Sequence, residues 1–288
     1  MQTIFFPFLW ENTLYRALVI GLLGLMVGSF LNVVIYRLPR MLDAAWRRDS
    51  ADYLGVPLDL GPTPNLLWPP SHCLQCKKRV APWYNIPLLG FILLRGCCAA
   101  CGSRISLHYP LVEALTAFLF AVVAWFISAP VALMGGLLFT AMLMALAFID
   151  IDTLLLPDVL TQPLLWAGLM FHIISVNVTL TDAVLGAVIG YLLLWSLYWI
   201  FRLFTGKHGM GHGDFKLLAA LGAWLGWQML PFIVFVSSLI GVAVGLVMIL
   251  GFKRQRGHAF PFGPYLALAG WLAFIRGEAI MNWYLYGL

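Results

Sequence analysis

Long apolar stretches separated by short polar ones dominate the chain. The first apolar stretch covers residues 13–36 and ends beside Arg37. Apolar residues return at 111 and continue, with brief polar interruptions, to 276. A stretch of about 18 or more apolar residues is long enough to cross a bilayer as a helix. This pattern predicts an α-helical protein that crosses a membrane several times.

Three of the apolar stretches are too long for a single span, and each contains a signal that breaks a helix. Proline ends or kinks a helix, and a polar patch indicates a turn outside the apolar layer. The expected breaks lie at Pro130 in residues 111–149, at 177–182 in residues 159–204, and at Pro231 in residues 217–252. With a last span within 260–276, we expect about eight transmembrane helices.

Composition and charge agree with this interpretation. The chain is 62% hydrophobic and 10% charged, whereas a soluble domain carries about a quarter charged residues. If the N-terminus lies outside and residues 37–110 lie in the cytoplasm, 15 of the 17 Lys and Arg residues fall in or beside cytoplasmic connections. This is the distribution that membrane proteins show. A single span over 217–252 would move the basic cluster 253–256 to the opposite side, so eight spans fit better.

The same patterns divide the chain into three regions. Residues 1–36 hold the first transmembrane helix, and residues 37–110 form a small cytoplasmic domain with all the cysteines. Residues 111–288 form a transmembrane core of about seven helices. The expected fold is therefore an α-helical polytopic membrane protein with one small cytoplasmic zinc-binding loop domain.

The cysteines form two CxxC pairs. Cys73 and Cys76 make the first pair, Cys98 and Cys101 make the second, and Cys97 is left over. Two such pairs supply the four thiolates of a tetrahedral zinc site. A cytoplasmic location argues against disulfides, and we expect one structural zinc ion per chain. Reduced free thiols or a redox pair are the alternatives.

Basic residues lie beside both cysteine pairs. They can offset the negative charge of the thiolates, or bind acidic head groups of membrane lipid. A basic face in contact with water explains them equally well. The residues are Lys77, Lys78, Arg79 and Arg104.

Two aspartates are expected at the same membrane depth on the cytoplasmic side. Asp150 follows an unbroken apolar stretch, and Asp214 precedes one. Two close carboxylates share one proton, because both cannot stay ionised, and such a pair can hydrolyse a peptide by acid–base catalysis. Asp152 points away from Asp150 on a helix and is explained by solvation. Asp158 is explained as the N-cap of the next helix.

Other interpretations of these residues stay open at this point. His208 and His212 could bind a metal with Asp214 if this stretch were helical, but three alternating glycines argue against a regular helix. Carboxylates in membrane helices also serve proton-coupled transporters. Lys216 could do no more than pair with Asp214 at the interface.

Several segments, in order along most of the chain, resemble the bacterial type IV prepilin leader peptidases, which are bifunctional peptidases and N-methyltransferases. The resemblance includes the two CxxC pairs and the motif Gly-His-Gly-Asp at 211–214. The other matching segments are 28–39, 82–90, 109–117, 148–158, 209–224 and 261–271.

The resemblance implies an aspartic protease in the membrane with Asp150 and Asp214 as catalytic residues. Gly211 and Gly213 would then let the backbone approach the scissile peptide, and Lys216 would support the site. The family's cysteine ligands match Cys73, Cys76, Cys98 and Cys101, which leaves Cys97 as a departure from the usual pattern. Gly96 and Glu113 match family positions for which a role in methylation is expected. For Glu113, a carboxylate at a helix start is the alternative.

The resemblance also implies the substrates. They are prepilins and the pseudopilins of type II secretion, cleaved after a glycine on the cytoplasmic side of the bacterial inner membrane. The new N-terminal residue, usually phenylalanine, is then methylated with S-adenosylmethionine as methyl donor. The residues themselves indicate no methyl-donor site, and no nucleic-acid partner is expected. The alternative function is a proton-coupled transporter, or an assembly factor for pili or secretion, with a zinc domain that docks a partner.

Overall fold

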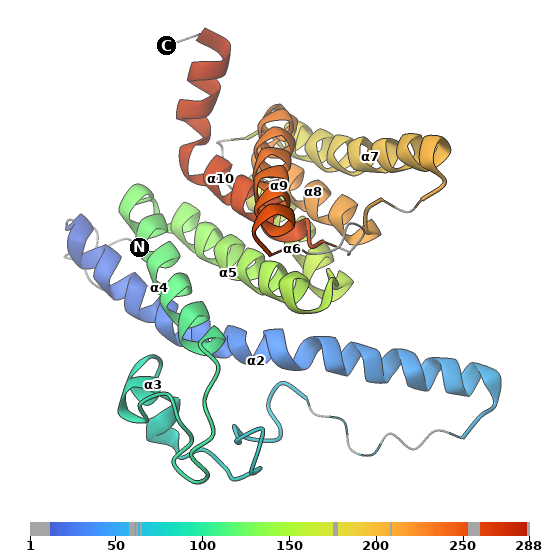
Figure 1. Cartoon of the computed structure of the whole chain (residues 1–288). Helices are drawn as coiled ribbons and strands as arrows, with labels where there is room; N and C mark the ends of the chain where they lie inside the picture. Colours follow the sequence, from blue (N-terminus) through green and yellow to red (C-terminus); the bar gives the residue numbers. More distant parts are fainter. Residues whose placement is uncertain are drawn as a thin grey trace. The chain divides into compact units, whose positions relative to one another are not determined.

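The computed structural model describes residues 12–57, 61, 63, 65–174, 178–207, 209–252 and 260–286. Within these residues the regular structure is helical, and strand-like pairing is limited to two isolated β-bridges. The chain forms two compact units, Met1–Ala129 and Pro130–Leu288 (Figure 1). The division expected at residues 36 and 110 stays a prediction.

The first unit is built on two helices, α2 (Thr13–Leu54) and α4 (His108–Phe126). The Asn12 side chain caps α2 by accepting a hydrogen bond from the Tyr15 N–H. Gly55, at a φ of 64°, ends the helix in the left-handed conformation that glycine adopts easily. α2 therefore continues well past residue 36, where its first span was expected to end. Pro39 lies inside the helix, so this proline does not stop it.

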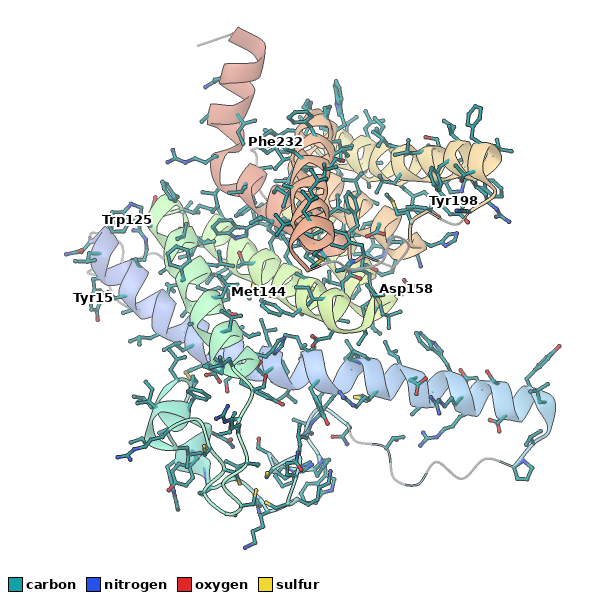
Figure 2. All side chains as sticks on the ribbon, in the orientation of Figure 1. Tyr15, Trp125, Met144, Asp158, Tyr198 and Phe232 are labelled. Atoms are coloured by element: carbon teal, nitrogen blue, oxygen red, sulfur yellow. The ribbon has the colours of Figure 1, made fainter. Side chains whose placement is uncertain are left out.

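Small residues let α2 and α4 approach closely along antiparallel directions. A Cβ atom on Gly24 would lie 2.7 Å from the Ala117 Cα, and one on Gly28 would lie 2.8 Å from the Glu113 Cα. Small residues at such crossings bring helix backbones together in membrane proteins. Figure 2 labels Tyr15 and Trp125 at one end of this helix pair.

The connection between α2 and α4 contains little regular structure. It holds the short helices η1 (Pro82–Asn85) and α3 (Leu89–Leu93). The Arg37 side chain donates hydrogen bonds to the carbonyls of Asn65 and Pro69, at 2.8 and 2.6 Å. These bonds fasten the returning chain to the middle of α2.

The described residues of the second unit form six longer helices and one 3₁₀ turn, η2 (Trp227–Met229). The breaks expected from the sequence are confirmed, since α5 begins at Pro130, α6 ends at Ile174 before α7 begins at Leu180, and α9 begins beside Pro231. The six helices are α5 (Pro130–Thr153), α6 (Asp158–Ile174), α7 (Leu180–Thr205), α8 (His212–Leu225), α9 (Leu230–Phe252) and α10 (Gly263–Tyr286).

The short helix α8 is the core of this unit. It packs against α6, α7 and α10 (Figure 1), and ten of its fourteen residues are buried. Gly186 of α7 faces Gly222 of α8, and a Cβ on Gly222 would lie 2.1 Å from the Gly186 carbonyl oxygen. The absence of side chains at this crossing lets α8 sit deep in the bundle.

Several polar groups in the core of this unit form hydrogen bonds between helices. The Trp224 indole N–H donates to the Leu164 carbonyl at 2.8 Å, and the Trp224 carbonyl lies 2.9 Å from His172 Nε2. The Trp271 indole N–H donates to the Thr140 hydroxyl at 3.0 Å. These bonds connect α6, α8, α10 and α5 inside an apolar interior, where an unpaired group would be costly.

Five helices in the described part of the chain are long and apolar enough to cross a membrane. They are α2, α4, α5, α7 and the region 227–248, which covers η2 and most of α9. α6 and α8 have 17 and 14 residues and are shorter than a typical span. The protein is therefore a multi-pass α-helical membrane protein, as the sequence predicts.

The crossing of α7 and α8 can be tested by adding a single methyl group. Gly222→Ala should lower the free energy of unfolding by about 1–3 kcal/mol, because the new Cβ overlaps the Gly186 carbonyl. Thermal unfolding in detergent measures the change. Gly245→Ala is the matched control, since that site has open space, and it should leave the protein as stable as before. Equal stability of the two variants would contradict the packing described here.

Candidate functional site

Asp150 lies buried near the end of α5. Its side chain is 5% exposed, and its Oδ2 accepts a hydrogen bond of 2.9 Å from the Gly263 backbone N–H at the start of α10. A Cβ on residue 263 would lie 2.7 Å from the same oxygen. Glycine at this position therefore leaves the space in which the carboxylate meets the N–H group.

Asp214 lies buried in the first turn of α8, with 6% exposure. The negative charge of Asp150 acts on the Asp214 carboxyl, and the Gly211 backbone provides a hydrogen bond to it. The first turn of a helix has unpaired N–H groups and a positive end of the dipole, which suits a carboxylate. α5 and α8 thus bring together the two aspartates that the sequence pairs.

Leu156, in the connection between α5 and α6, packs against the glycines next to both aspartates, Gly213 beside Asp214 and Gly263 at Asp150. A Cβ on Gly213 would lie 2.7 Å from the Leu156 Cβ, and a Cβ on Gly263 would lie 3.1 Å from its Cδ2. The starts of α8 and α10 therefore both approach this buried leucine closely.

The glycines before Asp214 have different surroundings. α8 begins at His212, so Gly213 is helical, and the expectation that no regular helix forms here is wrong for this residue. The helix begins early because Gly213 can pack directly on Leu156. A Cβ on Gly211 would meet only the Asp214 Oδ2, at 3.5 Å.

The alternative of a metal bound by histidines can be compared with the structure only in part, because His208 lies outside the described residues. The His212 ring packs against the rings of Tyr198 and Phe215, with centroids 5.3 Å away in each case. The group of possible metal ligands found among the described residues does not include His212 or Asp214.

Lys216 pairs with Asp158, and not with Asp214 as the sequence allowed. Its Nζ lies 2.7 Å from both carboxylate oxygens of Asp158, the first residue of α6 (labelled in Figure 2). Lys216 lies two residues after Asp214 and points to another helix, so the ion pair fastens the start of α8 to the start of α6. Asp152 lies exposed at the end of α5.

The four cysteines of the two CxxC pairs form one cluster. Their sulfur atoms all lie within 4.8 Å of one another, and Cys73 Sγ is 3.8 Å from Cys101 Sγ. A tetrahedral site with metal–sulfur bonds of about 2.3 Å requires sulfur atoms roughly 3.8 Å apart. The cluster could hold a metal ion. Cys97 is outside it, as the CxxC spacing predicts.

The two cysteine loops have the same backbone pattern. The Cys73 N–H donates to Lys78 and its carbonyl accepts from Lys77, while the Cys98 N–H donates to Ser103 and its carbonyl accepts from Gly102. The turn residues Lys77 and Gly102 both have a positive φ, 58° and 69°. Each loop thereby presents its two sulfur atoms on one side.

Hydrogen bonds from the loops favour thiolates at two of the cysteines. The Cys76 backbone N–H, together with the Ser103 hydroxyl, lowers the pKa of Cys73 to about 6. The Ser103 side chain likewise lowers the pKa of Cys101. The Lys78 backbone lowers the pKa of Cys76, but burial and the neighbouring thiols raise it to about 11.

Gly96 and Glu113 have evident structural roles, and their expected role in methylation stays a prediction. Gly96 has a φ of 71°, and a Cβ there would lie 3.1 Å from the Phe91 ring. Glu113 lies in α4 with 9% exposure and accepts a 2.8 Å hydrogen bond from the Leu88 N–H. Leu88 is itself a non-glycine residue at a φ of 57°, so Glu113 holds a strained turn in place.

Gly263 was missed as a site residue by the sequence reasoning. The signal was present, since this glycine lies between two prolines in Pro-Phe-Gly-Pro-Tyr at 261–265. A glycine in such a rigid segment often marks a place where the backbone approaches another group closely.

These features define a multi-pass membrane protein with two interacting buried carboxylates and a cysteine cluster suited to a metal ion. The model of the bacterial peptidase A24 N-terminal domain matches residues 22–127, and that of the type IV leader peptidase family matches residues 137–246. The chain belongs to the type IV leader peptidase family. No solved structure matches it.

Relatives in several bacteria match nearly the whole chain, and each bears the name prepilin leader peptidase/N-methyltransferase. The relative from Aeromonas hydrophila is 52% identical over 275 residues, which is 94% of either chain. That from Pseudomonas putida is 50% identical over 273 residues, or 95% of either chain. That from Neisseria gonorrhoeae is 48% identical over 270 residues, or 92% of this chain and 93% of its own.

The cysteine cluster can be tested by metal analysis of the purified protein. We expect about one metal ion per chain, because the four thiols match one tetrahedral site. Cys73→Ser or Cys101→Ser should lower the metal content well below one. Cys97→Ser is the matched control and should leave it unchanged. Full metal content in the Cys73 and Cys101 variants would contradict the four-sulfur site.

Proposed function

We propose that this protein removes the basic leader from type IV prepilins and related pseudopilins and then methylates the new N-terminal amine. The observation that carries this proposal is the pair of buried carboxylates, Asp150 and Asp214, which interact inside an apolar bundle. The names of the relatives, given to proteins that match over more than nine tenths of the chain, support both activities.

The two carboxylates can cleave a peptide by sharing one proton. The ionised carboxylate takes a proton from water while the protonated one gives its proton to the peptide carbonyl oxygen. The water oxygen bonds to the carbonyl carbon and forms a tetrahedral diol. When the C–N bond breaks, the carboxyl group that took its proton from water gives that proton to the nitrogen. The carboxylate that had protonated the carbonyl oxygen takes a proton back from a hydroxyl group of the diol. Both groups thereby return to their first protonation states. The products are the leader and a mature pilin with a free amine.

Neighbouring groups would keep the two aspartates in position. The Gly263 N–H orients Asp150, and the ion pair of Lys216 with Asp158 holds the start of α8, from which Asp214 projects. An exposed ion pair contributes little to stability. The role of the Lys216–Asp158 ion pair would instead be to fix the direction of α8.

The second activity requires a methyl donor. S-adenosylmethionine supplies an electrophilic methyl group to the amine nitrogen when it is bound. The cysteine cluster would hold zinc, because four thiolates in tetrahedral arrangement suit that ion. Zinc would have a structural role, fixing two loops that have little apolar core of their own.

The location proposed for the protein is the bacterial inner membrane, with the aspartates facing the cytoplasm. The distribution of Lys and Arg residues supports this orientation. The same distribution assigns residues 37–110, which hold the cysteine cluster, to the cytoplasm. Basic residues beside that cluster could then contact acidic membrane lipid. No observation favours the transporter alternative, and the names of the relatives do not support it.

Replacing either aspartate tests the proposed dyad. Asp150→Asn and Asp214→Asn should each lower leader cleavage by about a hundredfold to ten-thousandfold or more, because acid–base catalysis needs both groups. Mass spectrometry of a purified prepilin incubated with the protein in detergent measures cleavage. Asp152→Asn, an exposed neighbour of Asp150 on the same helix, is the control and should cleave normally. Retained cleavage in either dyad variant would disprove the dyad.

The Gly263 contact gives a separate test. Gly263→Ala should lower the rate of leader cleavage by roughly a hundredfold, because the added Cβ displaces the Asp150 carboxylate. Gly241→Ala is the matched control, since its Cβ would make only ordinary contacts of 3.6 Å or more. The same cleavage assay compares the two. If both variants cleave at the wild-type rate, Gly263 does not position Asp150.

A further inference from the structure

Asn32 is a buried amide with one unused acceptor. It lies on the face of α2 that packs against α4, and its side chain is 5% exposed. Its Nδ2 donates a 3.0 Å hydrogen bond to the Tyr109 carbonyl. A carbonyl oxygen can only accept, so this bond fixes which end of the amide faces Tyr109. The Asn32 Oδ1 therefore points elsewhere, and it is buried with no hydrogen-bond partner among the described residues.

A second acceptor, the Glu113 carboxylate, lies at the same level of the helix pair. Gly28 of α2 packs on the Glu113 backbone. Asn32 is one turn beyond Gly28, and Tyr109 is one turn before Glu113 on the antiparallel α4. Side chains on a helix lean toward its N-terminus, so the Glu113 side chain extends toward the level of Tyr109 and Asn32.

Among the residues that the structure describes, the Glu113 carboxylate has few partners. It accepts one hydrogen bond from the Leu88 N–H. In the part of the chain that the structure describes, no cationic side chain forms an ion pair with it. A buried carboxylate normally has a paired charge. At the same level of the helix pair, the Asn32 amide oxygen has no donor among the described residues.

A group that satisfies both acceptors must carry several N–H donors and a positive charge. A primary ammonium group has three donors and no acceptor. We propose that the Asn32 Oδ1 and the Glu113 carboxylate form a binding site for a primary ammonium group, used in methyl transfer and not in leader cleavage. This inference rests on the proposed function, which brings two such groups to the protein. They are the N-terminal amine of the mature pilin and the ammonium group of the methyl donor.

The experiment separates the two activities of one protein. Asn32→Leu removes the amide at similar volume, and Glu113→Gln removes the charge while keeping an acceptor for the Leu88 N–H. Thr116→Val is the matched control, because Thr116 is buried beside Gly28 and its hydroxyl bonds only to Val112 of its own helix. The full-length variants in detergent are given a prepilin for cleavage, and a previously cleaved pilin with S-adenosylmethionine for methyl transfer.

The expected result is a loss confined to methylation. kcat/KM for methyl transfer should fall by about tenfold to a hundredfold in Asn32→Leu and Glu113→Gln, because each loses a charge-assisted contact. Leader cleavage should stay at the wild-type rate in both, which also shows that the variants are folded. Thr116→Val should keep both activities. A higher KM for the pilin identifies its amine as the ligand, and a higher KM for the methyl donor identifies the donor's ammonium group.

Two results would overturn the inference. One is normal methyl transfer in both Asn32→Leu and Glu113→Gln. The other is a parallel loss of cleavage and methylation in both, which indicates a structural role only. A wild-type protein that neither cleaves prepilin nor methylates the pilin would instead refute the proposed function, and this inference with it.

Discussion

Burying carboxylates in an apolar helix bundle is the constraint on which the second unit depends. An ionised carboxylate without partners is very unfavourable in such surroundings. Asp150 receives the Gly263 N–H, and Asp214 lies at the start of α8 near unpaired backbone donors. Both arrangements require backbone to come close to neighbouring groups. Leu156 contacts the backbone at both places, at Gly213 and at Gly263. The packing of glycines and one leucine therefore determines where the charges lie.

Much of this arrangement could be predicted because its signals are local. Proline and polar residues mark breaks between helices whatever the rest of the fold, and the breaks at Pro130 and Pro231 follow this rule. CxxC spacing places two sulfur atoms within one loop. The four-sulfur cluster could therefore be predicted on the one further assumption that the two loops lie together. Asp150 and Asp214 were paired from their expected depth, which follows from counting spans and charges.

The remaining contacts could not be predicted because they join residues far apart in the chain. Nothing near Lys216 in the sequence indicates that its partner is Asp158, 58 residues earlier. That the Asn32 Oδ1 has no donor follows from the bond of its Nδ2 to the Tyr109 carbonyl, 77 residues away. The early start of α8 depends on a leucine from another connection. In each case the outcome depends on contacts with residues far away in the sequence, and the residues nearby do not indicate it.

The length of α2 has a mechanical consequence. At 1.5 Å per residue its 42 residues extend roughly 63 Å, about twice the 30 Å thickness of a hydrocarbon layer. If the first half of α2 crosses the membrane, the second half is a helix that extends into the water beyond it. Arg37 fastens the returning chain near the middle of α2. The chain that leads to the cysteine loops is thus bonded to α2 at Arg37, near the membrane surface, and again farther out, where Arg48 donates a 3.1 Å hydrogen bond to the Thr63 hydroxyl. The outer half of α2 therefore acts as a stiff support along which the returning chain is held.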